Sequence, residues 1–249
     1  MPDLTLYFAP GTCARSILVA LEEAGAPFKL EVVAHMRGDH KSPEYLALNP
    51  NGKVPVLVAD GHPIAETSAI LLYLAQVFPD AGLLPLQRDV TEDAVTISHL
   101  IWCSSELHGN VFRIRIPQYF CDTNPGRERQ KQMAMDTMHA KFAIIEQRLQ
   151  DGPWFLGGEW SVIDAFLLWV WFRLDGTGFD LARYAKFADH YARNMQRPSV
   201  QRALAREGEI GAELKAQGLM VDFNAFRPGN TPADFIAQQQ ENVAAGKGL

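Results

Sequence analysis

The chain has 249 residues, of which 47% are apolar and 21% are charged, and its formal net charge at pH 7 is −6. This length suffices for one large domain or two modest ones, and the composition is that of an ordinary folded protein. It excludes a wholly disordered chain, a collagen-like repeat and a disulfide scaffold. Because no basic patch stands out, we expect no nucleic-acid partner.

Local patterns argue against two further classes of protein. Cys13, Cys103 and Cys121 form no Cys-x-x-Cys pair, so we expect neither a disulfide framework nor a metal site, and their odd number is typical of a reducing compartment. The sequence does not begin with a basic segment followed by an apolar one. The longest apolar run, 165–172, is far shorter than the roughly 20 residues of a membrane helix. We therefore expect a cytoplasmic protein that does not enter membranes.

Strand and helix signals alternate through the first third of the chain. Leu4–Phe8 alternates with a period of two, Cys13–Ala24 has helical spacing, and Phe28–Val33 alternates again. Ser42, directly before a proline, predicts the start of a short helix. These segments predict the order strand, helix, strand, helix.

A hairpin and a further helix are expected next. Val54–Val58 is an apolar, β-branched strand, Asp60-Gly61 is a hairpin signal, and a short strand covers 62–65. A helix is expected over Thr67–Phe78. The order β-α-β-α-β-β-α predicts a mixed four-stranded sheet with helices on both faces.

Beyond Pro79 every periodic segment is helical, so we expect an α/β unit followed by an all-α unit. The segment 165–172 is apolar all round and belongs at the centre of a helix bundle, and Ser161 with Asp164 forms a capping box before it. The C-terminal segment from Gly218 onward is expected either to be loosely attached or to lie as a strap over the surface. The expected divisions are 1–79 for the α/β domain, 80–89 for a linker, 90–217 for the helical domain and 218–249 for a C-terminal extension.

Cys13 is the strongest candidate for chemistry. It follows Pro10-Gly11-Thr12 where a strand meets a helix, and the amides and dipole of a helix N-terminus favour an anion, so we expect a lowered pKa of its thiol. The alternative is that it is a small buried apolar residue. Ser16 stands where a second cysteine of a redox pair would be, so an external thiol is a better partner for Cys13 than an internal one.

Two segments could present backbone groups to a ligand. A cis bond at Val54-Pro55 would turn the backbone of Val54 toward a ligand, although an edge position in the sheet explains the proline equally well. At the junction Glu66-Thr67 the amides and the hydroxyl suit a carboxylate and the Glu66 side chain suits an ammonium, although a plain helix cap is the simpler interpretation.

Other charged and aromatic residues are weaker candidates. The loop 35–41 gathers cationic side chains that either hold a carboxylate or are simply solvated. His108 lies at the end of a long predicted helix and is of interest as a residue facing the first domain. A candidate acceptor pocket comprises Trp102, Phe112, Arg115 and Tyr119, although aromatic residues at helical spacing are more often core.

Together these motifs resemble the soluble glutathione transferase family. The likeness covers about residues 3–207 and is carried by Pro10–Cys13, Asn49–Leu57, Glu66–Ile70 and Ser161–Asp164. The segment Ser105–His108 and the cysteine placement resemble the bacterial beta class. The resemblance implies a thioredoxin-like N-terminal domain, an all-helical C-terminal domain, glutathione as co-substrate, a role in detoxification and a homodimer.

The resemblance also implies roles for individual residues. Val54 would pair through its backbone with the cysteinyl part of glutathione, Pro55 being the cis-proline, while Glu66 and Thr67 would hold the γ-glutamyl group. Cys13 and His108 would face the sulfur, with the Thr12 hydroxyl also within reach, and Asp164 would be a structural cap. The residues that would neutralise the glycyl end are His40, Lys41 and Lys53.

One departure from the family pattern concerns charge at the sulfur. Beta-class members often carry a lysine directly after the histidine, but Gly109 stands here, so one cation is missing. We predict a glutathione-dependent transferase that uses the thiolate against a small hydrophobic electrophile, by conjugation, dehalogenation or ether cleavage. The alternatives are thiol transfer or disulfide reduction through Cys13, and a glutathione-binding module without catalysis.

Overall fold

A four-stranded sheet forms the centre of the N-terminal unit in the computed structural model, which describes residues 1–86 and 89–220. The strand order is β2-β1-β3-β4, with β1 parallel to β2 and antiparallel to β3. Asp60 and Gly61, with φ of 48° and 81°, form the predicted hairpin turn between β3 and β4. The strands are β1 (Leu4–Phe8), β2 (Lys29–Val32), β3 (Val56–Ala59) and β4 (His62–Ala65).

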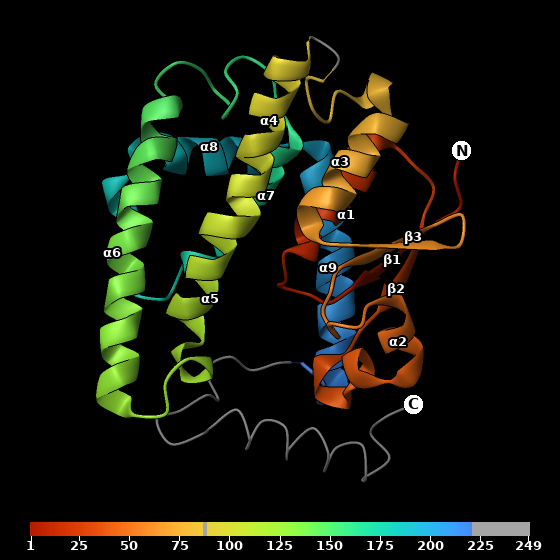
Figure 1. Cartoon of the computed structure of the whole chain (residues 1–249), viewed down its shortest axis with the longest axis horizontal. Coiled ribbons are helices and arrows are strands. Elements are labelled where there is room, and N and C mark those ends of the chain that lie inside the picture. The colour runs from red at the N-terminus through yellow and green to blue at the C-terminus, as the bar shows by residue number, and fades with distance from the viewer. Residues whose placement is uncertain (87–88, 221–249) are drawn as a thin grey trace.

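Helices cover both faces of this sheet because its side chains alternate (Figure 1). Leu6 and Leu57 lie opposite each other and pack with α1 (Ala14–Ala24) and α3 (Thr67–Val77). On the other face, Tyr45 of α2 packs against Val33 and Val56. The predicted order of strands and helices is therefore confirmed, with α2 at Pro43–Leu48 capped by Ser42.

The rest of the described chain is helical. The long helix that was predicted to end near His108 does not end there: a π-helical segment, Cys103–His108, joins α4 to α5. That prediction was wrong because no glycine turn or proline stops the helix before Pro117. The helices are α4 (Val90–Trp102), α5 (Gly109–Arg115), α6 (Asn124–Arg148), α7 (Val162–Leu174), α8 (Ala185–Met195) and α9 (Pro198–Ala216).

Helix α7 lies at the centre of the bundle, as its apolar sequence predicted. Most of its side chains are buried, and the predicted capping box at its start is confirmed. Asp164 accepts hydrogen bonds from the backbone N–H groups of Ser161 and Phe155, each at 2.8 Å, and its Oδ1 lies 2.8 Å from His190 Nε2. This network satisfies the buried carboxylate completely.

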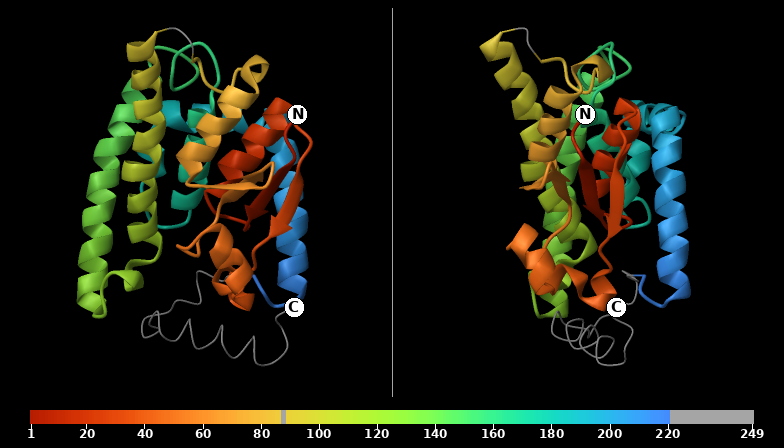
Figure 2. Two further views of the ribbon diagram at one scale, coloured as in Figure 1. Left: turned by 45° about the vertical axis from the view of Figure 1, so that its right-hand side comes forward. Right: turned by 90° about the vertical axis from the view of Figure 1, so that its right-hand side faces the viewer.

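The N-terminal unit and the helices share one hydrophobic core, because α1 packs against both α7 and α9. Figure 2 shows α9 lying beside the N-terminal unit. Leu83 and Leu84, in the predicted linker, are buried in this core. After α9, Leu219 packs against Ala34 and Met36; residues 221–249 of the predicted extension lie outside the described residues. Within the described ranges, no helix has the length and apolar character needed to cross a membrane.

Candidate functional site

The turn before α1 is held in place by the helical unit. Gly11 has a φ of 75°, a conformation that favours glycine. Its N–H donates to Glu207 Oε1 at 2.6 Å, and its carbonyl accepts from the indole Nε1 of Trp169 at 3.1 Å. Two helices far along the chain, α9 and α7, thus fix the backbone from which Cys13 projects.

Cys13 is buried, and its sulfur accepts a hydrogen bond from the Thr67 hydroxyl at 3.3 Å. Burial raises the pKa of the Cys13 thiol, and the Thr67 bond offsets only part of that effect. The prediction of a lowered pKa was wrong because the loss of solvation outweighs the favourable end of the helix. The Thr12 hydroxyl donates to the carbonyl of Ala9 at 2.6 Å, so the donor at the Cys13 sulfur is Thr67 rather than Thr12.

The loop before β3 presents the backbone of Val54. The Val54-Pro55 bond is cis, as the resemblance implied, and the paired register of β3 begins only at Val56. The preceding carbonyl, that of Lys53, accepts from the Tyr45 hydroxyl at 2.8 Å and from Asn49 Nδ2 at 2.7 Å. The backbone beside Val54 is therefore anchored from one side.

The start of α3 meets the start of α1. Glu66 is exposed and has a φ of 70°, an uncommon conformation for a residue other than glycine, and such conformations cluster at ligand sites. Thr67 follows at the first position of the helix and is buried against Cys13. Two helix N-termini, each a favourable place for negative charge, therefore converge at one point.

The three residues predicted to neutralise the glycyl carboxylate, His40, Lys41 and Lys53, differ in exposure and charge. Lys41 and Lys53 are exposed, and Lys41 Nζ lies 3.0 Å from the place that a Cβ on Gly52 would take. His40 is buried against His35, and burial lowers its pKa. His40 therefore offers a neutral ring, whose Nδ1 has no hydrogen-bond partner among the described residues, and the charge comes from the lysines.

His108 lies in the π-helical segment and stacks on Trp169, with ring centroids 5.0 Å apart. Since Trp169 bonds to Gly11, His108 is brought toward the Cys13 turn. Burial, together with the charges of Lys53 and Arg173, lowers the pKa of His108 to about 4. At neutral pH it is an uncharged ring that can donate or accept a hydrogen bond.

The structure separates the residues of the predicted acceptor pocket. Phe112 and Tyr119 are in contact, with centroids 5.6 Å apart, and both are exposed. Trp102 instead stacks on Phe155, which belongs to the cap of α7. Arg115 Nη1 donates to the carbonyl of Arg173 at 3.0 Å. Phe112, Tyr119 and Arg115 therefore remain candidates for the pocket, whereas Trp102 is partly buried and packs against the core.

Three charged residues at the site were missed by sequence reasoning. Arg15 and Glu207 form a buried ion pair with Nε–Oε2 and Nη2–Oε1 distances of 2.7 and 2.9 Å. Arg173 is buried at the end of α7, four residues after Trp169 and so on the same face of the helix. A charged residue directly after the apolar run of α7 was the available signal. The Arg15–Glu207 pair joins distant segments, and no sequence pattern announced it.

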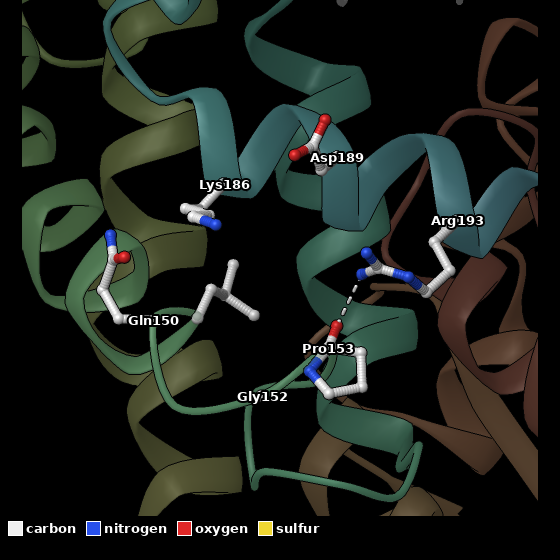
Figure 3. Close-up of a pocket in the computed structure, with 7 residues that line it drawn as sticks. Gln150, Gly152, Pro153, Lys186, Asp189 and Arg193 are labelled. Atoms are coloured by element: carbon white, nitrogen blue, oxygen red, sulfur yellow. Dashed lines mark hydrogen bonds between the residues drawn. The ribbon is translucent and has the colours of Figure 1, made fainter.

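A separate cavity of about 240 Å³ lies between the loop after α6 and helix α8 (Figure 3). Arg193 donates to the carbonyl of Pro153 at 2.8 Å across its wall. None of the predicted site residues lines this cavity, so the candidate chemistry is elsewhere. Across the described residues, no group of three or more His, Cys, Asp or Glu side chains is placed to hold a metal ion. The cavity is lined by Leu149, Gln150, Gly152, Pro153, Lys186, Asp189 and Arg193.

Comparison with protein families matches both units of the chain. The family model of the glutathione S-transferase N-terminal domain covers residues 11–77, and that of the C-terminal domain covers residues 124–193. Glutathione S-transferase GstA of Escherichia coli is 30% identical over 207 residues, which are 82% of this chain and 99% of the relative. Disulfide-bond oxidoreductase YfcG of Escherichia coli is 30% identical over 223 residues, with coverages of 84% and 98%.

Solved structures agree with these relatives. A glutathione transferase homologue from Sulfitobacter with bound glutathione has a TM-score of 0.71 and 32% identity, covering 88% of this chain and all of that one (100%). The beta-class glutathione S-transferase of Sphingomonas chungbukensis has a TM-score of 0.72 and 32% identity, with coverages of 82% and 98%.

The sheet with its cis-proline loop, joined to a helical unit, defines a protein with a thioredoxin-like domain and an all-helical domain. With the sequence matches to both domains, the chain belongs to the glutathione S-transferase family. The predicted fold class and the predicted family are therefore confirmed.

Proposed function

We propose that the protein is a glutathione-dependent transferase that uses the thiolate of bound glutathione against a small hydrophobic electrophile. The observation that carries this proposal is the meeting of the α1 and α3 N-termini, where the Thr67 hydroxyl lies 3.3 Å from the Cys13 sulfur. A thiolate at this point would receive hydrogen bonds and the favourable end of two helix dipoles. The glutathione-bound Sulfitobacter homologue and the transferase GstA support the same activity.

The surrounding residues fit the parts of glutathione. The backbone of Val54, outside the β3 ladder, suits the cysteinyl peptide groups. The exposed carboxylate of Glu66 suits the γ-glutamyl ammonium, and Lys41 and Lys53 suit the glycyl carboxylate. The unpartnered Nδ1 of buried His40 provides a further position for a polar ligand atom.

The chemical task is to keep the thiol ionised. A free thiol has a pKa near ~8.5, so it is mostly protonated at neutral pH. After the proton leaves to solvent, the thiolate attacks the electrophilic carbon, a C–S bond forms, and any leaving group departs with the bonding electrons. The apolar side of the acceptor site would be formed by Phe112 and Tyr119, which are in contact and exposed.

The test is turnover of an activated aryl halide with glutathione, measured together with calorimetric binding of glutathione. Turnover that saturates in both substrates is the expected result. Tight binding of glutathione without turnover of aryl halides, epoxides or disulfides would instead establish a binding module. If the protein neither binds glutathione nor turns over these substrates, the proposal is contradicted.

A second candidate function is disulfide exchange through Cys13, which the similarity to the oxidoreductase YfcG favours. In this reaction the Cys13 thiolate attacks oxidised glutathione, forms a mixed disulfide and releases one glutathione thiolate. Burial and the raised pKa of Cys13 argue against it. Intact-mass measurement after incubation with oxidised glutathione distinguishes the two functions. A glutathionyl adduct that is present in the wild type and absent in Cys13→Ser would favour disulfide exchange over the transferase function.

We also propose that the protein is a cytoplasmic homodimer. Three cysteines without disulfides suit a reducing compartment. Large apolar side chains of α4, namely Val90, Val95 and Ile101, are exposed in the single chain and would be covered by a second copy. Light scattering should show twice the mass of one chain, and a single species near 28 kDa would contradict the dimer.

A further inference from the structure

The C-terminal end of α9 packs against the loop between β2 and α2 (residues 33–42). Leu214 and Leu219 are 6% and 3% exposed. They form one cluster of buried side chains with two residues of this loop, Ala34 and Met36. Both leucines lie after residue 193, where the match to the C-terminal domain of the family ends. The contact therefore joins a segment outside the matched domain to a loop of the N-terminal unit.

A glycine turn at the end of α9 holds Leu219 in this cluster. Gly218 has a φ of 69°, and its N–H donates to the carbonyl of Lys215 at 3.1 Å. The N–H of Leu219 donates to the carbonyl of Leu214 at 2.8 Å. These two bonds form a Schellman motif, which commonly brings an apolar side chain after the turn back onto the last turn of the helix. Leu219 and Leu214 thus form one apolar surface against the loop.

The loop that docks on this surface is folded around one carboxylate. Asp39 accepts from the backbone N–H of Ala34 at 2.8 Å, and from Nε and Nη2 of Arg37, each at 2.7 Å. Because these bonds tie Ala34 to Asp39, a shift of Ala34 would also move the two residues that follow Asp39, namely His40 and Lys41. The end of α9 is therefore linked to those two residues through buried contacts and hydrogen bonds.

His40 and Lys41 belong to the place proposed for the glycyl carboxylate of glutathione. His40 is buried against His35, and Lys41 Nζ lies 3.0 Å from the place that a Cβ on Gly52 would take, directly before Lys53. A loop that becomes ordered only when its ligand binds loses affinity, because ordering costs conformational entropy. Packing on α9 orders this loop in advance.

We propose that Leu214 and Leu219 are positioning residues, which hold the β2–α2 loop in the conformation that binds the glycyl carboxylate of glutathione. This role rests on the proposed transferase function. The leucines act through Ala34 and Met36 and not by contact with the sulfur. Loss of the contact should therefore weaken binding of the glycyl end, and leave the chemistry of the thiol unchanged once glutathione is bound.

The experiment compares glutathione with γ-glutamylcysteine, which lacks the glycyl residue. Calorimetric binding and steady-state kinetics are measured on wild type, Leu219→Ala and the matched control Leu149→Ala, each checked by thermal unfolding. Leu149 is 5% exposed at the end of α6 and lines the separate cavity. The two variants thus remove the same groups from similarly buried positions, but only one of these positions contacts the loop.

The expected result is a selective loss of affinity for glutathione. Leu219→Ala should raise the Kd and KM for glutathione about tenfold, with kcat at saturating glutathione within about twofold of wild type. Its binding of γ-glutamylcysteine should change by less than about twofold. Leu149→Ala should keep the wild-type preference for glutathione over γ-glutamylcysteine. Leu219→Met, which keeps the apolar volume, should bind glutathione as wild type does.

A variant on the loop side tests the same contact. Met36→Ala should cause the same selective loss, and it provides the measurement if Leu219→Ala does not fold. Because removing either partner breaks the contact, the effect of the double variant Met36→Ala/Leu219→Ala should be smaller than the product of the two single effects. Fully multiplicative effects would show that the two residues act independently and would overturn the proposal.

Failure of the inference and failure of the proposed function give different results. If wild type prefers glutathione and Leu219→Ala keeps this preference, only the positioning role is overturned. Equal loss of affinity for both thiols would show that the leucine supports the whole domain, and would overturn it likewise. If wild type turns over glutathione but binds it no more tightly than γ-glutamylcysteine, the inference fails and the transferase function stands. If wild type neither binds nor turns over glutathione, the transferase proposal fails as well.

Discussion

The N-termini of α1 and α7 lie in the same core but are completed differently. At α7, Asp164 accepts from two backbone N–H groups and lies within hydrogen-bond distance of His190, so the chain itself supplies the negative charge. At α1, which follows Cys13, no side chain of the described residues caps the helix. In the proposed function, the thiolate of glutathione supplies negative charge at this second N-terminus.

The comparison shows that the electrostatics of a helix N-terminus does not by itself indicate whether that N-terminus binds a ligand or is capped by the protein. Both ends favour an anion, yet one holds a carboxylate of the same chain, whereas the other adjoins Thr67 and is the proposed place for the thiolate of glutathione. The difference between them is that a side chain forms the cap hydrogen bonds at α7, whereas no side chain of the described residues does so at α1. Variants at each end should therefore affect different properties.

The largest expected effect concerns the N-terminus of α7, where Asp164 forms the cap. Asp164→Ala should lower the free energy of unfolding by about 3–5 kcal/mol, because it leaves buried donors without an acceptor. Asp189→Ala, at an exposed position of α8, should change it by less than about 0.5 kcal/mol. Urea denaturation measures the free energy of unfolding of both variants. Equal changes in the two would contradict a stabilising role of the Asp164 cap.

Stability should also depend on pH through two half-buried histidines. His35 and His108 have folded pKa values of about 4 and an unfolded value of 6.5, so both are neutral in the folded protein above pH 6.5. As the pH falls from 6.5 toward 4, the unfolded chain binds protons first, and stability should decrease by about 1–3 kcal/mol for each histidine.

Chemical denaturation across this pH range, on wild type and His108→Gln, tests that prediction. The variant should lose less stability between pH 6.5 and 4 than wild type, because it has one fewer histidine with a lowered pKa. Parallel curves for the two proteins would contradict the lowered pKa of His108.

A smaller effect is expected at the N-terminus of α1. Thr67→Val removes the hydroxyl beside the Cys13 sulfur and should lower kcat/KM for conjugation by about tenfold to a hundredfold, the value of a hydrogen bond to a charged group. Thr67→Ser keeps the hydroxyl and should retain most of the activity. Steady-state kinetics of both variants give the comparison, and an active Thr67→Val enzyme would remove Thr67 from the mechanism.

The smallest effect concerns the half-buried thiol of Cys121, which lies shortly before the start of α6. Hydrogen bonding with Thr123 lowers the pKa of Cys121, whereas burial raises that of Cys13 and Cys103. One equivalent of an alkylating agent should therefore label Cys121 first, as peptide mass mapping would show, and should change the free energy of unfolding by less than about 0.5 kcal/mol. First labelling of Cys13 would show that its burial is incomplete.

Much of the architecture could be predicted from local signals. The period of two in Leu4–Phe8, the Asp60-Gly61 turn and the capping box of Ser161 and Asp164 each determine a local conformation by short-range sterics and hydrogen bonding. These elements are all present as predicted. The prediction of a helix end near His108 was wrong, because a π-helical segment there continues directly into α5 and the first proline comes only at Pro117.

The sequence by itself determined the secondary-structure order, the cis-proline motif and the family, since these depend on neighbouring residues. Only the tertiary structure decided the character of the site. It buried Cys13 and raised its pKa, brought Thr67 to the sulfur, stacked Trp102 on Phe155, and placed Arg173 at the turn. The physical reason is that burial and charge–charge interactions depend on distances between residues far apart in the chain, which no local pattern specifies.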